Sequence, residues 1–123
     1  MIVRNIAEAE PFTTKDGSTI RELLGIPTAP VRNQSLAEAT LAAGQATDRH
    51  YHRVAEEIYF ITEGGGLMEV DGVQRRVAPG DAILIPPGAW HQLTADSGPD
   101  AAPCLKLLCC CAPAYTHDDT YFE

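Results

Sequence analysis

The feature that most constrains the fold is the regular spacing of turn residues between residues 35 and 112. Glycine, proline and aspartate recur about every ten residues and separate short segments rich in apolar residues. Asp71-Gly72 is the strongest of these turn signals, because this pair favours the tight turn of a hairpin. No long stretch repeats its apolar residues with the period of a helix. The pattern predicts an all-β sandwich or barrel.

The predicted strands are the segments enriched in β-branched, aromatic and other apolar residues. They are residues 35–41, 57–62, 67–70, 73–77, 82–85, 89–94 and 104–112. The 35–41 segment also suits a helix, and only the turn residues that follow it favour a strand. The patterning before residue 35 is weaker: Ile2, Val3 and Ile6 suit a short strand, whereas residues 19–24 suit a strand or one helical turn.

A chain of 123 residues, 45% of them apolar, is long enough to close one core but not two. We divide it into three parts. Residues 1–34 form an N-terminal arm with potential edge strands, residues 35–112 form the barrel, and residues 113–123 form a C-terminal tail.

The charge balance argues against a nucleic-acid partner. Seventeen acidic and nine basic side chains give a net charge of −8, and Lys and Arg do not cluster. The N-terminus has no apolar run of signal-peptide length, and no segment is apolar for long enough to span a membrane. We therefore expect a cytoplasmic protein with no membrane partner, in which the four cysteines are thiols.

Three of these cysteines are consecutive, which suits neither a disulfide framework nor a structural zinc site. In a strand, Cys109 and Cys111 face one side and Cys110 faces the other. Cysteine packs as a small apolar residue, so we favour core filling for this run over chemistry. A thiol near a cavity would still be open to oxidation or function.

The residues that carry chemistry surround a His-x-His pair. Side chains alternate across a strand, so His50 and His52 project to the same side, where two imidazoles can bind one ion. His91 follows a Pro-Pro-Gly turn further along the chain, and Glu56 and Glu57 compete to supply a carboxylate. Three imidazoles and one carboxylate suit a divalent transition metal (Fe, Zn, Mn, Ni, Co or Cu). The alternative is that the histidines lie in an exposed loop.

At these residues the chain resembles the cupin superfamily. The first cupin motif has a glycine, five residues, His, one residue, His, three or four residues, Glu, six residues and Gly. The chain meets every interval with Gly44, His50, His52, Glu57 and Gly64. The motif interval to Gly64 and the alternation of the strand both favour Glu57 over its neighbour as the inward carboxylate.

The second cupin motif has a glycine, five residues, Pro, one residue, Gly, two residues, His, three residues and Asn. Gly80, Pro86, Gly88 and His91 fit it, whereas Ala95 occupies the final Asn position. That departure lies outside the ligand set. The two motifs span residues 44 to 95 in the right order and separation, which is far more specific than a His-x-His pair alone.

The resemblance implies a double-stranded β-helix, or jelly-roll barrel, of a small single-domain cupin. It implies His50, His52, Glu57 and His91 as the metal ligands, and a homodimer. The arm segment RELLG (21–25) and the tail segment AYTHDD (114–119) are similar to those of bacterial single-domain cupins loosely described as mannose-6-phosphate isomerase-like. Some cupins of this build act as polyketide cyclases or dioxygenases.

We therefore expect a metal-dependent enzyme acting on a small carbonyl, phenolic or polyketide-like substrate by oxygenation, isomerisation or cyclisation. The alternative is a non-catalytic module that binds or senses a small molecule or a metal, and a storage role is third. No general base stands out, so Glu57 and Tyr59 are the catalytic candidates. Tyr59, Ile61 and Leu93 share faces with the ligands and are predicted to line the pocket.

As a group, the large side chains Tyr59, Phe60, Met68 and Trp90 are interpreted as barrel packing and not as a cofactor-binding set. His117 lies in the polar tail and is interpreted as a solvated surface histidine.

Overall fold

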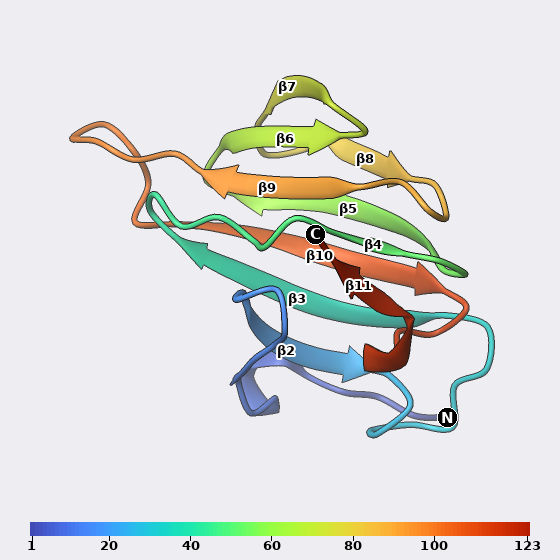
Figure 1. Ribbon diagram of the computed structural model, residues 1–123. Coiled ribbons are helices and arrows are strands. Elements are labelled where there is room, and N and C mark those ends of the chain that lie inside the picture. Colours follow the sequence, from blue (N-terminus) through green and yellow to red (C-terminus); the bar gives the residue numbers. More distant parts are fainter.

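Two antiparallel sheets form the protein, as a computed structural model describing residues 1–123 shows (Figure 1). The strands are β1 (Phe12–Thr13), β2 (Thr19–Leu24), β3 (Ser35–Ala42), β4 (His50–His52), β5 (Glu56–Glu63), β6 (Gly66–Val70), β7 (Val73–Val77), β8 (Ala82–Ile85), β9 (His91–Ala95), β10 (Cys104–Ala112) and β11 (Thr120–Phe122). Two short 3-10 helices, η1 (Ile6–Glu8) and η2 (His117–Asp119), complete the chain. No helix is long and apolar enough to cross a membrane.

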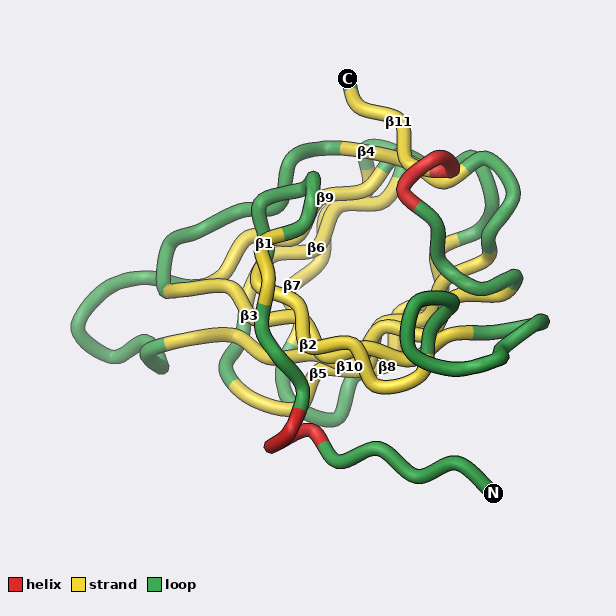
Figure 2. Tube along the Cα trace, turned by 90° about the horizontal axis from the view of Figure 1, so that it is seen from below, coloured by secondary structure: helices red, strands yellow, loops and turns green.

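The strand order confirms the predicted jelly-roll barrel. One sheet has six strands in the order β1-β2-β3-β10-β5-β8, and the other has five in the order β11-β4-β9-β6-β7. Seen along the barrel in Figure 2, the strands of the two sheets surround a common interior, with β4, β9 and β11 opposite β2, β5 and β10. Segments distant in sequence are neighbours in this arrangement, so the barrel brings the two motifs together.

Alternation of side chains sets the core. The inward residues of β5 are Glu57, Tyr59 and Ile61, each no more than 5% exposed, while their neighbours along the strand face outward. Twelve buried apolar residues form one cluster between the sheets. Its most enclosed members include Leu41, Ile61, Ile85, Leu93, Leu105 and Leu107. The hairpin predicted at Asp71-Gly72 is present, and both residues have the positive φ that its tight turn requires.

Some predictions about individual segments were wrong. Ile2 and Val3 are exposed and form no strand, because no other segment pairs with them, and Ile6 begins η1. Phe60 is 41% exposed and not packed in the barrel, since alternation with Tyr59 turns it outward. The 19–24 segment is a strand, not a helical turn.

Two further strands, β1 and β11, were not predicted. Each has too few residues to show a period of its own and forms by pairing with a neighbour: β1 with β2, and β11 with β4.

Candidate metal centre

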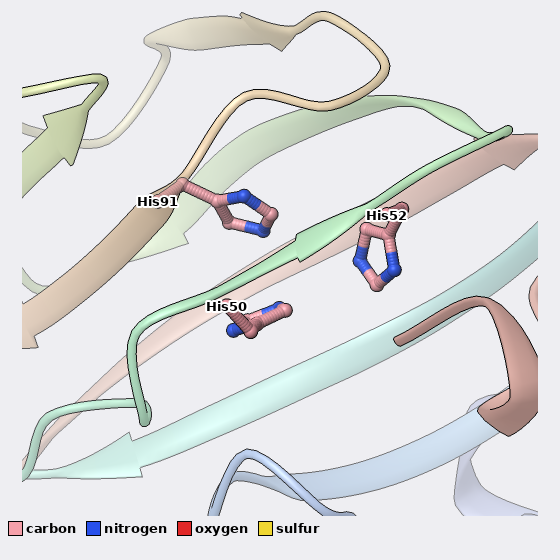
Figure 3. Close-up of side chains that lie close together, drawn as sticks. All are labelled: His50, His52 and His91. Carbon is pink, nitrogen blue, oxygen red and sulfur yellow. The ribbon is translucent and has the colours of Figure 1, made fainter. Parts of the chain in front are cut away.

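Three imidazoles converge inside the barrel. His50 and His52 project inward from β4, and His91 starts β9, where it pairs with His50 in the sheet. One nitrogen from each lies within 4.8 Å of the others, and the three side chains are at most 4% exposed. Figure 3 shows the rings turned toward one another from two neighbouring strands. The side chain between them, Tyr51, faces away and stacks on Tyr121.

A carboxylate reaches the same point from the opposite sheet. Glu57 Oε1 lies 3.3 Å from His52 Nε2 and 3.5 Å from His91 Nε2. Glu57 is 5% exposed, whereas Glu56 is exposed to solvent. Glu57 therefore points inward from β5. The three histidines and Glu57 lie together between the two sheets.

Backbone carbonyls determine which imidazole nitrogen faces the centre. Each histidine donates from Nδ1 to a carbonyl oxygen: His50 to Asp48 at 2.7 Å, His52 to Asp119 at 3.1 Å and His91 to Ala89 at 3.0 Å. A carbonyl oxygen only accepts, so the proton is on Nδ1 and the Nε2 lone pair is directed inward. Hydrogen bonds of this kind orient metal-binding histidines and fix their tautomer.

The donor set fits a metal ion. His91 Nε2 and Glu57 Oε1 are buried and have no hydrogen-bond partner. Buried polar atoms without partners are costly, and a cation between these two atoms and the other two imidazoles would satisfy all of them. Three nitrogens and one oxygen suit the transition metals predicted from the sequence. Affinity depends on pH, because protons compete for the same atoms.

Burial and neighbouring charges shift the pKa values of Glu57, His52 and His50 in different directions. Burial alone would raise the pKa of Glu57, but the neighbouring His52 and His91 outweigh it, and the pKa lies well below its usual range. Burial would lower the pKa of His52, but the Glu57 carboxylate outweighs it and raises the pKa. Burial and the nearby His91 lower the pKa of His50. The carboxylate is thus ionised across the physiological range.

A cavity of about 980 Å³ opens beside this centre, and most of its wall surface is apolar. Tyr59 and Leu93 line it. Ile61 does not, because it lies further along β5 and is enclosed in the core cluster. More than half of the 33 lining residues come from the arm and the tail, so the least patterned segments form most of the cavity wall.

Four residues at the site were not predicted from the sequence: Asp16 in the arm, Cys111 in β10, and Tyr115 and Asp119 in the tail. Asp16 lines the cavity with Oδ2 3.9 Å from His50 Nε2, and Ser18 donates two hydrogen bonds to its Oδ1. The ring of Tyr115 packs edge-on against the ring of His52, and the hydroxyl oxygen of Tyr115 lies 3.1 Å from His117 Nδ1. His117 is exposed, as interpreted, but lines the cavity.

Cys111 and Asp119 are the other two missed residues. Cys111 pairs with Glu57 across β10 and β5, and its thiol donates to Glu57 Oε2 at 3.0 Å. Asp119 contacts both His52 and the turn that follows it. The local sequence contains no signal for these contacts, because they depend on which distant strands become neighbours.

The fold and the site together define a jelly-roll barrel with a candidate mononuclear metal centre at its interior. The cupin domain model matches residues 37–102, which include all four predicted ligands. The chain therefore belongs to the cupin family.

Curated relatives that match this chain at the level of sequence include two proteins from different organisms. The uncharacterized protein MJ1618 of Methanocaldococcus jannaschii is 43% identical over 125 aligned residues, covering 98% of this chain and 97% of that protein. Protein SchB of Streptomyces halstedii is 28% identical over 82 residues, covering 67% of this chain and 59% of that protein.

Solved structures with low sequence identity share the fold. A Pac13 variant from Streptomyces, in complex with uridine, has a TM-score of 0.79 at 15% identity and covers all of this chain and 91% of its own. The polyketide cyclase RemF from Streptomyces resistomycificus has a TM-score of 0.76 at 21% identity, with 97% and 89% covered. At these identities the likeness extends to the fold alone.

Proposed function

We propose that this protein is a metal-dependent enzyme that acts on a small, largely apolar organic substrate held in the cavity. The observation that carries the proposal is the position of the four inward donors beside a cavity large enough for a drug-sized molecule. Structural neighbours that include a nucleoside dehydratase and a polyketide cyclase support an enzyme by analogy of fold.

His50, His52, Glu57 and His91 are the residues that would hold the ion. When bound, a divalent ion with open positions supplies Lewis acidity toward a carbonyl or enolate oxygen. This is the chemistry that isomerisation and cyclisation require. If the ion is iron, its open positions also suit dioxygen, so oxygenation belongs to the same proposal.

Two groups of the cavity wall are placed to contact the substrate. Burial raises the pKa of Tyr59 well above its usual value, so its hydroxyl stays protonated at neutral pH and is available to donate a hydrogen bond to a substrate. Asp16 Oδ1 is held by Ser18, and its Oδ2 faces the centre from the opposite side. We propose Tyr59 as a donor and Asp16 as an acceptor to the substrate, and Glu57 as a ligand only.

The charges around the cavity limit the class of substrate. Four carboxylates of the arm line the wall, whereas Arg4 is the only lysine or arginine among the lining residues. The four carboxylates are Glu8, Glu10, Asp16 and Glu22. The four carboxylates disfavour an anion, and Arg4 is left as the one lysine or arginine that could pair with a phosphate. We therefore propose a neutral substrate, such as a diketone, a phenol or a polyketide-like compound, and not a sugar phosphate.

The test has two stages. Elemental analysis of the purified protein should find one transition metal per chain, and a His50→Ala/His91→Ala variant should lose it. The metal-loaded protein is then incubated with diketones, phenols and polyketide-like compounds, with dioxygen uptake and product mass followed. Turnover lost in the double variant supports the enzyme. Tight binding of a compound without turnover across the panel contradicts it and identifies a binding module.

Two other predictions are retained as proposals. Three outward apolar side chains on β5 and β8, Ile58, Phe60 and Leu84, are 41–57% exposed and offer a surface for a homodimer. We also propose a cytoplasmic location, where the four free cysteines would remain thiols.

A further inference from the structure

The strand that carries two of the four donors is short and depends on its neighbours. β4 has three residues, and it pairs with β9 at one position only, His50 with His91. Its other edge pairs with β11 at three positions, which place Thr120 opposite His52 and Phe122 opposite His50. The C-terminal strand therefore supplies most of the sheet pairing that fixes His50 and His52.

One carboxylate fixes the connection between β4 and β5. Asp119 accepts hydrogen bonds from the backbone N–H groups of Arg53 at 3.1 Å, Val54 at 3.0 Å and Ala55 at 2.9 Å. These residues lie between His52 and Glu57. Consecutive N–H groups that point at one anion form a stable anion-binding turn. The side chain of Asp119 thus sets the geometry between two of the donors.

The main chain of the same residue orients an imidazole. The carbonyl oxygen of Asp119 accepts from His52 Nδ1 at 3.1 Å, and Thr120 Oγ1 lies 3.4 Å from the same nitrogen. Asp119 holds both the turn that follows His52 and the ring of His52 itself. Loss of the carboxylate would free the turn. The backbone of Asp119 could then move, and its carbonyl oxygen would no longer be held against His52 Nδ1.

The main hydrophobic cluster contains no residue of this segment. The twelve residues of the core cluster all lie between Ala39 and Leu107, so none belongs to the C-terminal tail. A change at Asp119 is therefore expected to disturb the site more than the barrel.

We propose that Asp119 is a positioning residue that fastens the C-terminal segment over β4 and thereby assembles the metal centre. The proposal rests on the proposed metal site and adds a residue from outside both sequence motifs. Partners that orient the ligands of a metal commonly change its affinity about 10- to 100-fold when they are removed.

The test compares Asp119→Ala with Asp118→Ala. Asp118 precedes it, is exposed and makes no side-chain hydrogen bond, so the control removes the same charge from the same segment. Two quantities are measured: the dissociation constant for Co²⁺ or Zn²⁺, and amide hydrogen exchange at Val54 and Ala55 in metal-free protein. Asp119→Ala should weaken metal binding about 10-fold or more and expose both amides to exchange. Asp118→Ala should leave both close to wild type.

A second variant, Asp119→Asn, keeps one oxygen acceptor and should give intermediate exchange and intermediate affinity. It also keeps the test valid if the alanine variant unfolds. Wild-type affinity in Asp119→Ala with protected Val54 and Ala55 amides would overturn the proposal. If wild-type protein binds no metal, the proposed function fails, while the exchange measurement still decides whether Asp119 holds the turn.

Discussion

The thiol of Cys111 offers a sharp test of how the metal centre is organised. The side chain is 2% exposed and donates to Glu57 Oε2 at 3.0 Å, leaving Oε1 directed at the histidines. Burial and the Glu57 carboxylate raise the pKa of this thiol far above its usual range, so it remains a protonated donor. Replacing Cys111 with alanine removes the donor and leaves one carboxylate oxygen without a partner.

The magnitude follows from the kind of hydrogen bond that is lost. A bond to a charged acceptor contributes about 1.5–3 kcal/mol, and a thiol is a weak donor, so the lower end applies. Partners that orient the ligands of a metal commonly change its affinity about 10- to 100-fold when they are removed, so loss of this weak donor in Cys111→Ala should weaken metal binding about tenfold. Cys111→Ser supplies a hydroxyl donor at the same place and should restore most of the affinity.

The assay is a metal titration of the three proteins with thermal melting of each metal-free form. Cys110→Ala is the matched control, because Cys110 lies on the outward face beside Ile58 and does not contact Glu57. It should bind metal as wild type does. Wild-type affinity in Cys111→Ala would refute the reasoning, as would equal losses in the Cys110 and Cys111 variants.

Three further predictions concern pH, packing and assembly. Metal affinity should rise with pH and level off only above 6.5, the usual pKa of histidine, because the raised pKa of His52 lets a proton compete with the metal above that value. A plateau below pH 6 in metal titrations would contradict this. Gly66→Ala should lower the free energy of unfolding by about 1–3 kcal/mol in urea melts, because the new methyl group would clash with the Thr94 carbonyl oxygen and the Leu105 side chain. Unchanged stability would show that β6 and β9 can move apart to admit the methyl group. A Phe60→Lys/Leu84→Lys variant should convert a dimer to a monomer in light scattering, and a monomeric wild type would make the dimer prediction wrong.

Much of the fold was predictable because its signals are local. Turn pairs such as Asp71-Gly72 and the alternation around Tyr59 act within a few residues, and the structure has the strands they predict. The strand predictions failed at the two ends of the chain. Ile2 and Val3 have strand-like composition without a partner, whereas β11 has a partner without a strong pattern of its own.

The candidate site divides in the same way. The sequence by itself determined that His50 and His52 share a face, that Glu57 and not Glu56 points inward, and that His91 follows a turn at a fixed interval. The shared face of His50 and His52 follows from the two-residue period of a strand, and the inward face of Glu57 from the same period together with the cupin motif interval. The position of His91 follows from the Pro-Pro-Gly turn and the spacing of the second motif. They are properties of short segments and need no knowledge of neighbouring strands.

Only the tertiary structure decided what surrounds those residues. Strand pairing between segments more than fifty residues apart places Cys111 against Glu57 and Asp119 against His52. The arm that carries Asp16 folds over the opposite side. A period of two residues says which face a side chain occupies but not which strand lies next to it. That choice is made by packing of the whole barrel, because neighbouring strands are selected together with the core that they enclose.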